Sequence, residues 1–219
     1  MRNTTIKILL SILCLANLDT SAQQKKAIMT MPVTTNQNSL SAQEREGAIK
    51  FLEETKSEVF RALKNLKATQ LTFKPGADKW SIEECVKHIA AAEKTLWAMV
   101  EESLKQPANP EKREGIEFSD QELVNAVKDR TQKSKTFAAL EPANSSYKTM
   151  EQALASFKEN REKLIAFVKG TKEDLRNHVS VLPIGTYDAY QFILLISAHT
   201  NRHVQQIEEV TDNTNFPEN

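Results

Sequence analysis

Four short motifs of one kind constrain the fold of this chain more than any other feature of its sequence. In each, a Ser or Thr is followed three residues later by Glu or Gln: Ser41 and Glu44, Ser81 and Glu84, Ser119 and Glu122, and Thr149 and Gln152. In such a capping box the hydroxyl and the longer side chain satisfy backbone N–H groups that the start of a helix leaves unpaired. The four boxes therefore predict four helix starts.

Apolar residues at helical spacing follow each box, which supports the helix assignment. We expect the helix that begins at Ser119 to reach about Leu140, where Pro142 stops it. A fifth helix should start after Pro183 and Gly185, with Thr186 as its cap, and its segment 192–196 is apolar on every face. A helix apolar all round is usually buried in the middle of a bundle.

The rest of the pattern favours an all-α fold. No alternating strand pattern is present, and 5 glycines and 7 prolines are few for the turns of a β sandwich. We predict a bundle of four main helices with an additional helix over residues 41–212, followed by a flexible tail over 213–219. Loops 106–118 and 141–148 should shape access to any site.

The first residues resemble a targeting signal rather than part of the fold. Residues 1–22 have a basic start, an apolar run over 8–16 and small residues before a cleavage point, the pattern of a secretory signal peptide. Residues 23–40 are polar and aperiodic, and we expect a flexible leader. The protein is then exported, periplasmic or secreted. Translation from Met29 or Met31 would instead give a cytoplasmic protein.

Composition excludes several classes of function. The 29 basic residues balance 29 acidic residues, which gives no support to nucleic-acid binding. No run of 18 apolar residues exists, so we expect no membrane span. After cleavage Cys85 would be the only cysteine, which excludes an internal disulfide and a cysteine-based zinc site, and we expect it to be a small buried residue.

The four histidines are the most informative residues. His199 and His203 are four apart in the last helix, so they point the same way one turn apart, and two imidazoles so placed can share one metal ion. His88, in the second helix, is the natural third ligand, because bundle sites are built from facing helices. Such pairs also occur by chance on solvated faces, and His88 could be a hydrogen-bonded boundary residue. His178 has no partner spacing, and we interpret it as a surface or loop residue.

Two segments resemble the DinB-like superfamily of four-helix-bundle proteins. One is Trp80-Ser81-Ile82-Glu83-Glu84 followed by His88-Ile89-Ala90-Ala91-Ala92-Glu93. The other runs from Leu182-Pro183-Ile184-Gly185 through Tyr190-Gln191 to His199-Thr200-Asn201-Arg202-His203-Val204-Gln205-Gln206-Ile207. The resemblance implies a divalent metal held by His88, His199 and His203, and a homodimer. Zinc, nickel, iron and manganese all occur in such families, and three neutral nitrogens favour zinc or nickel.

Three functions from different classes follow from these residues. In a metal-dependent hydrolase an open metal site would activate water, and Glu93 is the candidate general base, although it could instead be a partner of a ligand or a solvated carboxylate. A thiol-dependent transferase or isomerase, also implied by the resemblance, needs a cytosolic thiol pool, and export argues against it. A non-catalytic, stress-related metal-binding bundle is the third. The small-molecule substrate is not identified. Asp188 and Arg202 could line a cavity, but each is more simply a helix-start carboxylate or a solvated charge.

Overall fold

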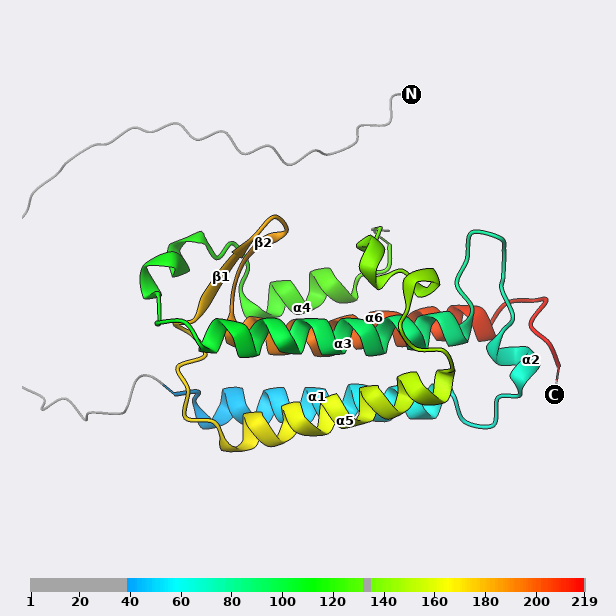
Figure 1. Ribbon diagram of the computed structural model, residues 1–219, viewed down its shortest axis with the longest axis horizontal. Helices are drawn as coiled ribbons and strands as arrows, with labels where there is room; N and C mark the ends of the chain where they lie inside the picture. The colour runs from blue at the N-terminus through cyan, green and yellow to red at the C-terminus, as the bar shows by residue number, and fades with distance from the viewer. Residues whose placement is uncertain (1–38, 132–134, 219) are drawn as a thin grey trace, which may run out of the picture. The chain divides into compact units, whose positions relative to one another are not determined.

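Four long helices lie side by side and form the body of the structure, a computed structural model that describes residues 39–131 and 135–218 (Figure 1). They are α1 (Ala42–Ala62), α3 (Ile82–Leu104), α5 (Met150–Gly170) and α6 (Ala189–Thr211). Each packs against two of the others, in the order α1, α5, α3, α6 and back to α1. The short helix α4 (Asp120–Lys128) lies outside this ring against α6. The predicted all-α bundle with one additional helix is confirmed.

The predicted caps explain where these helices begin. Ser41, Ser81 and Ser119 each form a complete capping box, in which the hydroxyl accepts from the N–H three residues on and the Glu carboxylate accepts from the Ser N–H. At the fourth start, Thr149 accepts from the N–H of Gln152, but the Gln152 side chain accepts from the N–H of Lys148 instead. All four predicted helix starts are confirmed, and the fourth has half of its box.

The additional helix is shorter than we predicted. It ends at Lys128 rather than near Leu140, because Asp129 turns into extended backbone. No apolar residue occurs between positions 129 and 136, so a longer helix would have had no face to bury. Two 3-10 turns, η2 (Ala138–Leu140) and η3 (Pro142–Asn144), follow instead and lie over α3.

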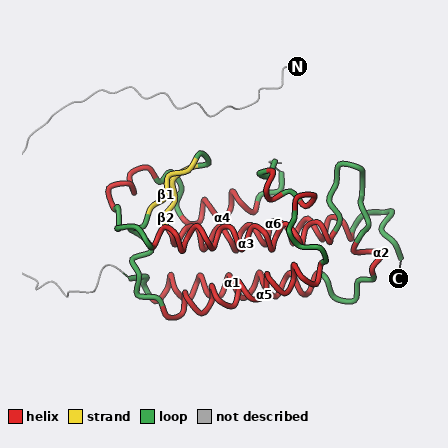
Figure 2. The backbone as a smooth tube through the Cα atoms, viewed as in Figure 1, coloured by secondary structure: helices red, strands yellow, loops and turns green. Residues whose placement is uncertain are grey.

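A small hairpin corrects our expectation that the chain contains no strands. Strands β1 (Val179–Leu182) and β2 (Gly185–Asp188) pair antiparallel, with Val179 opposite Asp188 (Figure 2). Strands of four residues are too short to show an alternating pattern. Since Thr186 lies within β2, the cap of α6 is Asp188, whose carboxylate accepts from the N–H of Gln191.

The connecting segments lie at the ends of the bundle. The short helix α2 (Ala68–Leu71) lies beside the C-terminal segment, where Phe73 packs edge-to-face on Phe216. Loop 106–118 contains the 3-10 helix η1 (Pro110–Gly115), which packs against the β1–β2 hairpin. The predicted signal peptide and residues 23–38 of the predicted leader lie outside the described residues. No helix among the described residues is both long and apolar enough to span a bilayer.

The apolar core of the bundle is divided into two clusters along the helix axes. One cluster lies toward the hairpin and contains Leu52, Trp97, Leu164 and the start of α6, and the other contains Val59, Cys85, Phe157 and Val204. Between them each long helix contributes one buried polar side chain at the same level, in the order α1, α3, α5 and α6: Thr55, Glu93, Arg161 and Thr200. The core therefore contains a polar layer.

Candidate metal centre

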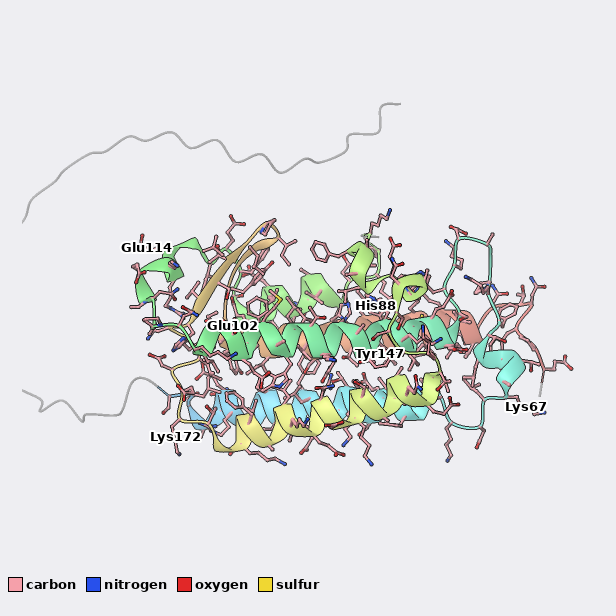
Figure 3. The ribbon with its side chains drawn as sticks, viewed as in Figure 1. Lys67, His88, Glu102, Glu114, Tyr147 and Lys172 are labelled. Carbon is pink, nitrogen blue, oxygen red and sulfur yellow. The ribbon has the colours of Figure 1, made fainter. Side chains whose placement is uncertain are left out.

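The structure brings three of the four histidines together between α3 and α6. The Nε2 atom of His199 lies 3.2 Å from Nε2 of His88 and 3.2 Å from Nε2 of His203. The three side chains each offer one ligand atom, and these atoms all lie within 4.8 Å of one another. In Figure 3, His88 lies on α3 near the segment with the two 3-10 turns. The three histidines singled out in the sequence are therefore the three that the structure brings together.

Hydrogen bonds to the other ring nitrogens orient two of these imidazoles. Nδ1 of His88 lies 2.8 Å from the carbonyl oxygen of Leu140, and Nδ1 of His203 lies 2.9 Å from Oε1 of Gln206. Both partners are oxygens that only accept, so each Nδ1 carries the proton and each Nε2 presents its lone pair. Metal-binding histidines are usually held in this way by an acceptor behind the ring.

The spacing of the nitrogens fits a bound transition metal. Zinc–nitrogen bonds of about 2.0–2.1 Å at tetrahedral angles place two ligand nitrogens roughly 3.3 Å apart. The two His199 distances, 3.2 Å each, are close to this value. The Nε2 lone pairs of His88 and His203 both point toward Nε2 of His199. The neutral His199 ring has one N–H proton, which can donate to only one of these lone pairs. A cation bound among the three nitrogens would accept the lone pairs of all three rings.

Burial keeps the three imidazoles neutral. His88 and His203 are buried, and His199 retains partial exposure. Removal from water lowers the pKa of His88, lowers that of His199 to about 3, and lowers that of His203, with the neighbouring imidazoles adding to the shift for His199 and His203. Metal binding requires neutral imidazole, so the site needs no proton release from these rings near neutral pH.

A cleft of about 750 Å³ reaches this cluster from solvent, with His203 and Trp80 in its wall. The indole of Trp80 stacks on His203 at 5.9 Å between ring centroids and packs at 4.9 Å against His88. Residues from segments 74–80, 135–143 and 202–213 line the cleft. Segment 141–143 belongs to one loop that we expected to shape access. Loop 106–118 contributes none of the lining residues and packs on the hairpin instead.

Glu93 is not part of the histidine cluster. Glu93 is five positions after His88, which is about 140° around the helix, so the two side chains leave α3 on different faces. Its two carboxylate oxygens accept from Nε and an Nη of Arg161 at 2.6 and 2.7 Å, and both side chains are fully buried. The structure thus brings Glu93 to Arg161 in the polar layer and leaves neither oxygen without a cationic partner.

The other residues singled out in the sequence have structural partners. His178 lies in the loop before β1 as predicted, but it is buried rather than at the surface, with Nδ1 3.0 Å from the Ser103 carbonyl oxygen. Cys85 is buried as predicted, and burial raises its pKa to about 12. Asp188 is the predicted helix-start carboxylate. Arg202 is not simply solvated, because its guanidinium donates to the carbonyl oxygens of Val127 and Asp129.

Sequence reasoning missed the groups behind the histidines. The Leu140 acceptor is a backbone carbonyl, which every residue has, so no sequence motif can mark it. Gln206 stands in the segment quoted for the resemblance but received no role, although it lies three residues after His203 on the same face of the predicted helix. Arg161 had no recognisable signal, since an arginine in an amphipathic helix usually lies on the solvated side.

Comparison with known proteins shows the family of this chain. YuaE of Bacillus subtilis (strain 168), described as an uncharacterized protein, is 28% identical over 162 residues, covering 73% of this chain and 94% of YuaE. A solved structure, described as YfiT from Bacillus subtilis, a probable metal-dependent hydrolase with an unusual four-helix bundle topology, matches with a TM-score of 0.56. At 15% identity, over 86% of this chain and 95% of YfiT, this likeness shows the fold alone. The family model of the DinB superfamily matches residues 52–207, and the chain therefore belongs to the DinB superfamily.

Proposed function

We propose that the protein binds one divalent transition metal through His88, His199 and His203 and acts as a metal-dependent hydrolase on a small molecule. The observation that carries the proposal is the convergence of three Nε2 atoms, two of them with the proton held on Nδ1. The description of YfiT as a probable metal-dependent hydrolase supports the same reading. Three nitrogen ligands favour zinc or nickel over magnesium or calcium, and iron or manganese would also accept them.

A metal held by three side chains keeps a coordination position for water or substrate, and when bound it supplies hydroxide near neutral pH. The chain contributes the rest. His203 and Trp80 lie in the wall of the cleft, so a small molecule bound there would lie beside a residue that would hold the metal. The Leu140 carbonyl and the Gln206 amide hold the imidazoles before substrate arrives.

We assign the general base to neither Glu93 nor a carboxylate of the cleft. The Glu93 oxygens both accept from Arg161, on another face of α3. Each carboxylate lining the cleft also has a cationic partner within 4 Å, in the pairs Lys79–Asp78, Lys74–Glu84, Lys135–Glu141 and Arg130–Glu209. A metal-bound water with a lowered pKa needs less help from a base, which suits this arrangement.

The test is the metal content of untagged protein purified without chelators. We expect about one transition metal per chain in the wild type and none in the His199→Ala/His203→Ala double variant, with unchanged circular dichroism. His178→Gln is the matched control, because His178 is a buried histidine outside the cluster, and it should keep the metal. A folded wild type that takes up neither zinc nor nickel would refute the proposal.

Catalysis is tested separately with the metal-loaded protein. Ester, amide and phosphoester substrates are screened with the wild type and the double variant in parallel. Turnover that is lost in the double variant and restored in wild type when metal is returned supports a hydrolase. Stoichiometric metal without turnover of any of these classes would instead favour the non-catalytic metal-binding bundle.

A further inference from the structure

We propose that Gln206 is a positioning residue, which fixes His203 with its Nε2 lone pair directed at the shared metal position. This inference rests on the proposed metal site and goes beyond it, because it assigns a role to a side chain that is not a ligand. The Gln206 side chain is partly buried, lines the cleft and lies one helical turn after His203 on α6.

The contact itself determines the tautomer. Oε1 of Gln206 lies 2.9 Å from Nδ1 of His203. An amide oxygen accepts and cannot donate, so the proton of the neutral ring must lie on Nδ1. The lone pair then lies on Nε2, which is the atom that faces His199 at 3.2 Å. With the opposite tautomer the lone pair would point at Gln206, away from the other two histidines.

A second donor explains why the oxygen of Gln206, and not its NH₂ group, faces His203. Nη1 of Arg130 lies 3.5 Å from the same Oε1, at the outer limit of a hydrogen bond. A guanidinium can only donate, so a flipped amide would point its NH₂ group at another donor. Arg130 is itself held by both carboxylate oxygens of Glu209, at 2.6 Å each. Glu209, Arg130, Gln206 and His203 thus form one ordered chain of donors and acceptors.

The group that contacts His203 is an amide rather than a carboxylate, which has a consequence for the charge around a bound metal. A carboxylate behind a histidine raises the basicity of the ring and adds negative charge near the site. The two outer acceptors seen here, the Gln206 amide and the Leu140 carbonyl, are both neutral. Three neutral rings with neutral partners leave the charge of a bound cation uncompensated.

The experiment measures zinc affinity at one fixed pH by competition with a chromophoric chelator. Gln206→Leu removes the acceptor at similar volume, and we expect a 10–100-fold loss of affinity, the effect typical of outer partners of metal ligands. Gln206→Glu keeps an acceptor and should bind zinc at least as tightly as the wild type. Circular dichroism and thermal unfolding check that each variant folds.

Gln205→Leu is the matched control. Gln205 is the adjacent residue on α6, and its amide nitrogen donates to the Lys128 carbonyl and to Asn201, whereas the Gln206 oxygen accepts from His203. The same substitution there should leave zinc affinity within about threefold of the wild type. Equal losses for the two leucine variants would mean that amide loss acts through the stability of α6, and that result would overturn the inference.

A second readout, free of metal, separates this inference from the proposed function. Long-range ¹H–¹⁵N spectra of the apo protein report which ring nitrogen of His203 carries the proton. We expect Nδ1–H in the wild type and in Gln206→Glu, and a mixture or Nε2–H in Gln206→Leu. Nε2–H in the wild type would overturn the inference even if zinc binds. Failure of the wild type to bind either zinc or nickel would overturn the proposed function, while the tautomer would still decide the role of Gln206.

Discussion

The buried ion pair between Glu93 and Arg161 offers the sharpest test of how this bundle is held together. All five N–H groups of the guanidinium are used: Nε and one on Nη2 donate to Glu93, and the others donate to the Leu52 carbonyl, Thr55 and Thr200. Both charged side chains have no exposed area. We therefore expect Glu93→Ala to leave an uncompensated charge in the core.

The size of the effect follows from that geometry. Removing one partner of a buried pair costs about 3–5 kcal/mol, against a total stability of roughly 5–15 kcal/mol for a typical protein. At about 2–4 °C per kcal/mol for a chain of this size, the melting temperature should fall by roughly 6–20 °C.

Replacing both partners should behave differently. Apolar replacement of a whole buried pair is often neutral, or stabilising by about 1–4 kcal/mol. In the Glu93→Leu/Arg161→Met double variant, the hydroxyls of Thr55 and Thr200 would keep their hydrogen bonds to the carbonyl oxygens of Phe51 and Ile196. Neither hydroxyl would therefore be left as a buried donor without an acceptor. It should be close to the wild type in stability.

The assay is urea unfolding followed by circular dichroism for Glu93→Ala and for the four members of a double-mutant cycle: the wild type, Glu93→Leu, Arg161→Met and the Glu93→Leu/Arg161→Met double variant. Glu159→Leu on α5 is the control, because its carboxylate is 2.6 Å from the Lys163 ammonium but both side chains are exposed, and it should change the urea midpoint little. A cost below about 1 kcal/mol for Glu93→Ala, or a double variant as unstable as that single variant, would refute the reasoning.

Three further changes test other parts of the structure. Leu195→Ala, in the buried apolar half of α6, should cost about 2–5 kcal/mol in urea unfolding, and a cost under about 1 kcal/mol would contradict its place in the core. Asn144→Ala removes the hydrogen bond to the Ala138 carbonyl, which holds the segment that carries the Leu140 oxygen behind His88. Losing this bond should destabilise the segment by about 1 kcal/mol and weaken zinc binding by up to about fivefold. Unchanged zinc affinity would show that His88 does not depend on this segment. The metal-free protein should lose stability as pH falls from about 6.5 toward 3, because the unfolded chain takes up protons on histidines whose folded pKa is lowered, to about 3 for His199. His199→Leu should therefore make the urea midpoint depend less on pH between pH 7 and pH 5. A variant whose midpoint falls with pH as steeply as that of the wild type would contradict this expectation.

The features that could be predicted from sequence were those whose residues all lie within a single helix. A capping box lies within four residues, so the start of α3 at Ser81 was readable directly. The pair His199 and His203 was equally local, since a spacing of four places both on one face of any helix. The third ligand had to come from another helix, and His88 could be identified because the chain contains only four histidines.

The features that could not be predicted depend on how one helix is rotated against another. Glu93 follows His88 closely in sequence, but 140° of rotation takes it to the interior of the bundle. Arg161 reads as a solvated residue, and its burial requires acceptors from three other helices at the same level. The end of α4 and the two short strands are set by packing and by turns, and neither has a long periodic pattern.

The polar layer and the histidine cluster constrain the same helix from two sides. Thr200, which accepts from Arg161 at 2.9 Å, directly follows His199 and is about 100° from it around α6. The rotation of α6 that directs Thr200 toward α5 therefore also directs His199 and His203 toward His88. Apolar side chains pack with less angular selectivity than a bidentate ion pair, so the layer sets a rotation that hydrophobic burial alone leaves loosely specified. The polar layer therefore sets the angle at which α6 presents the histidines, and the stability of the bundle rests on the two apolar clusters.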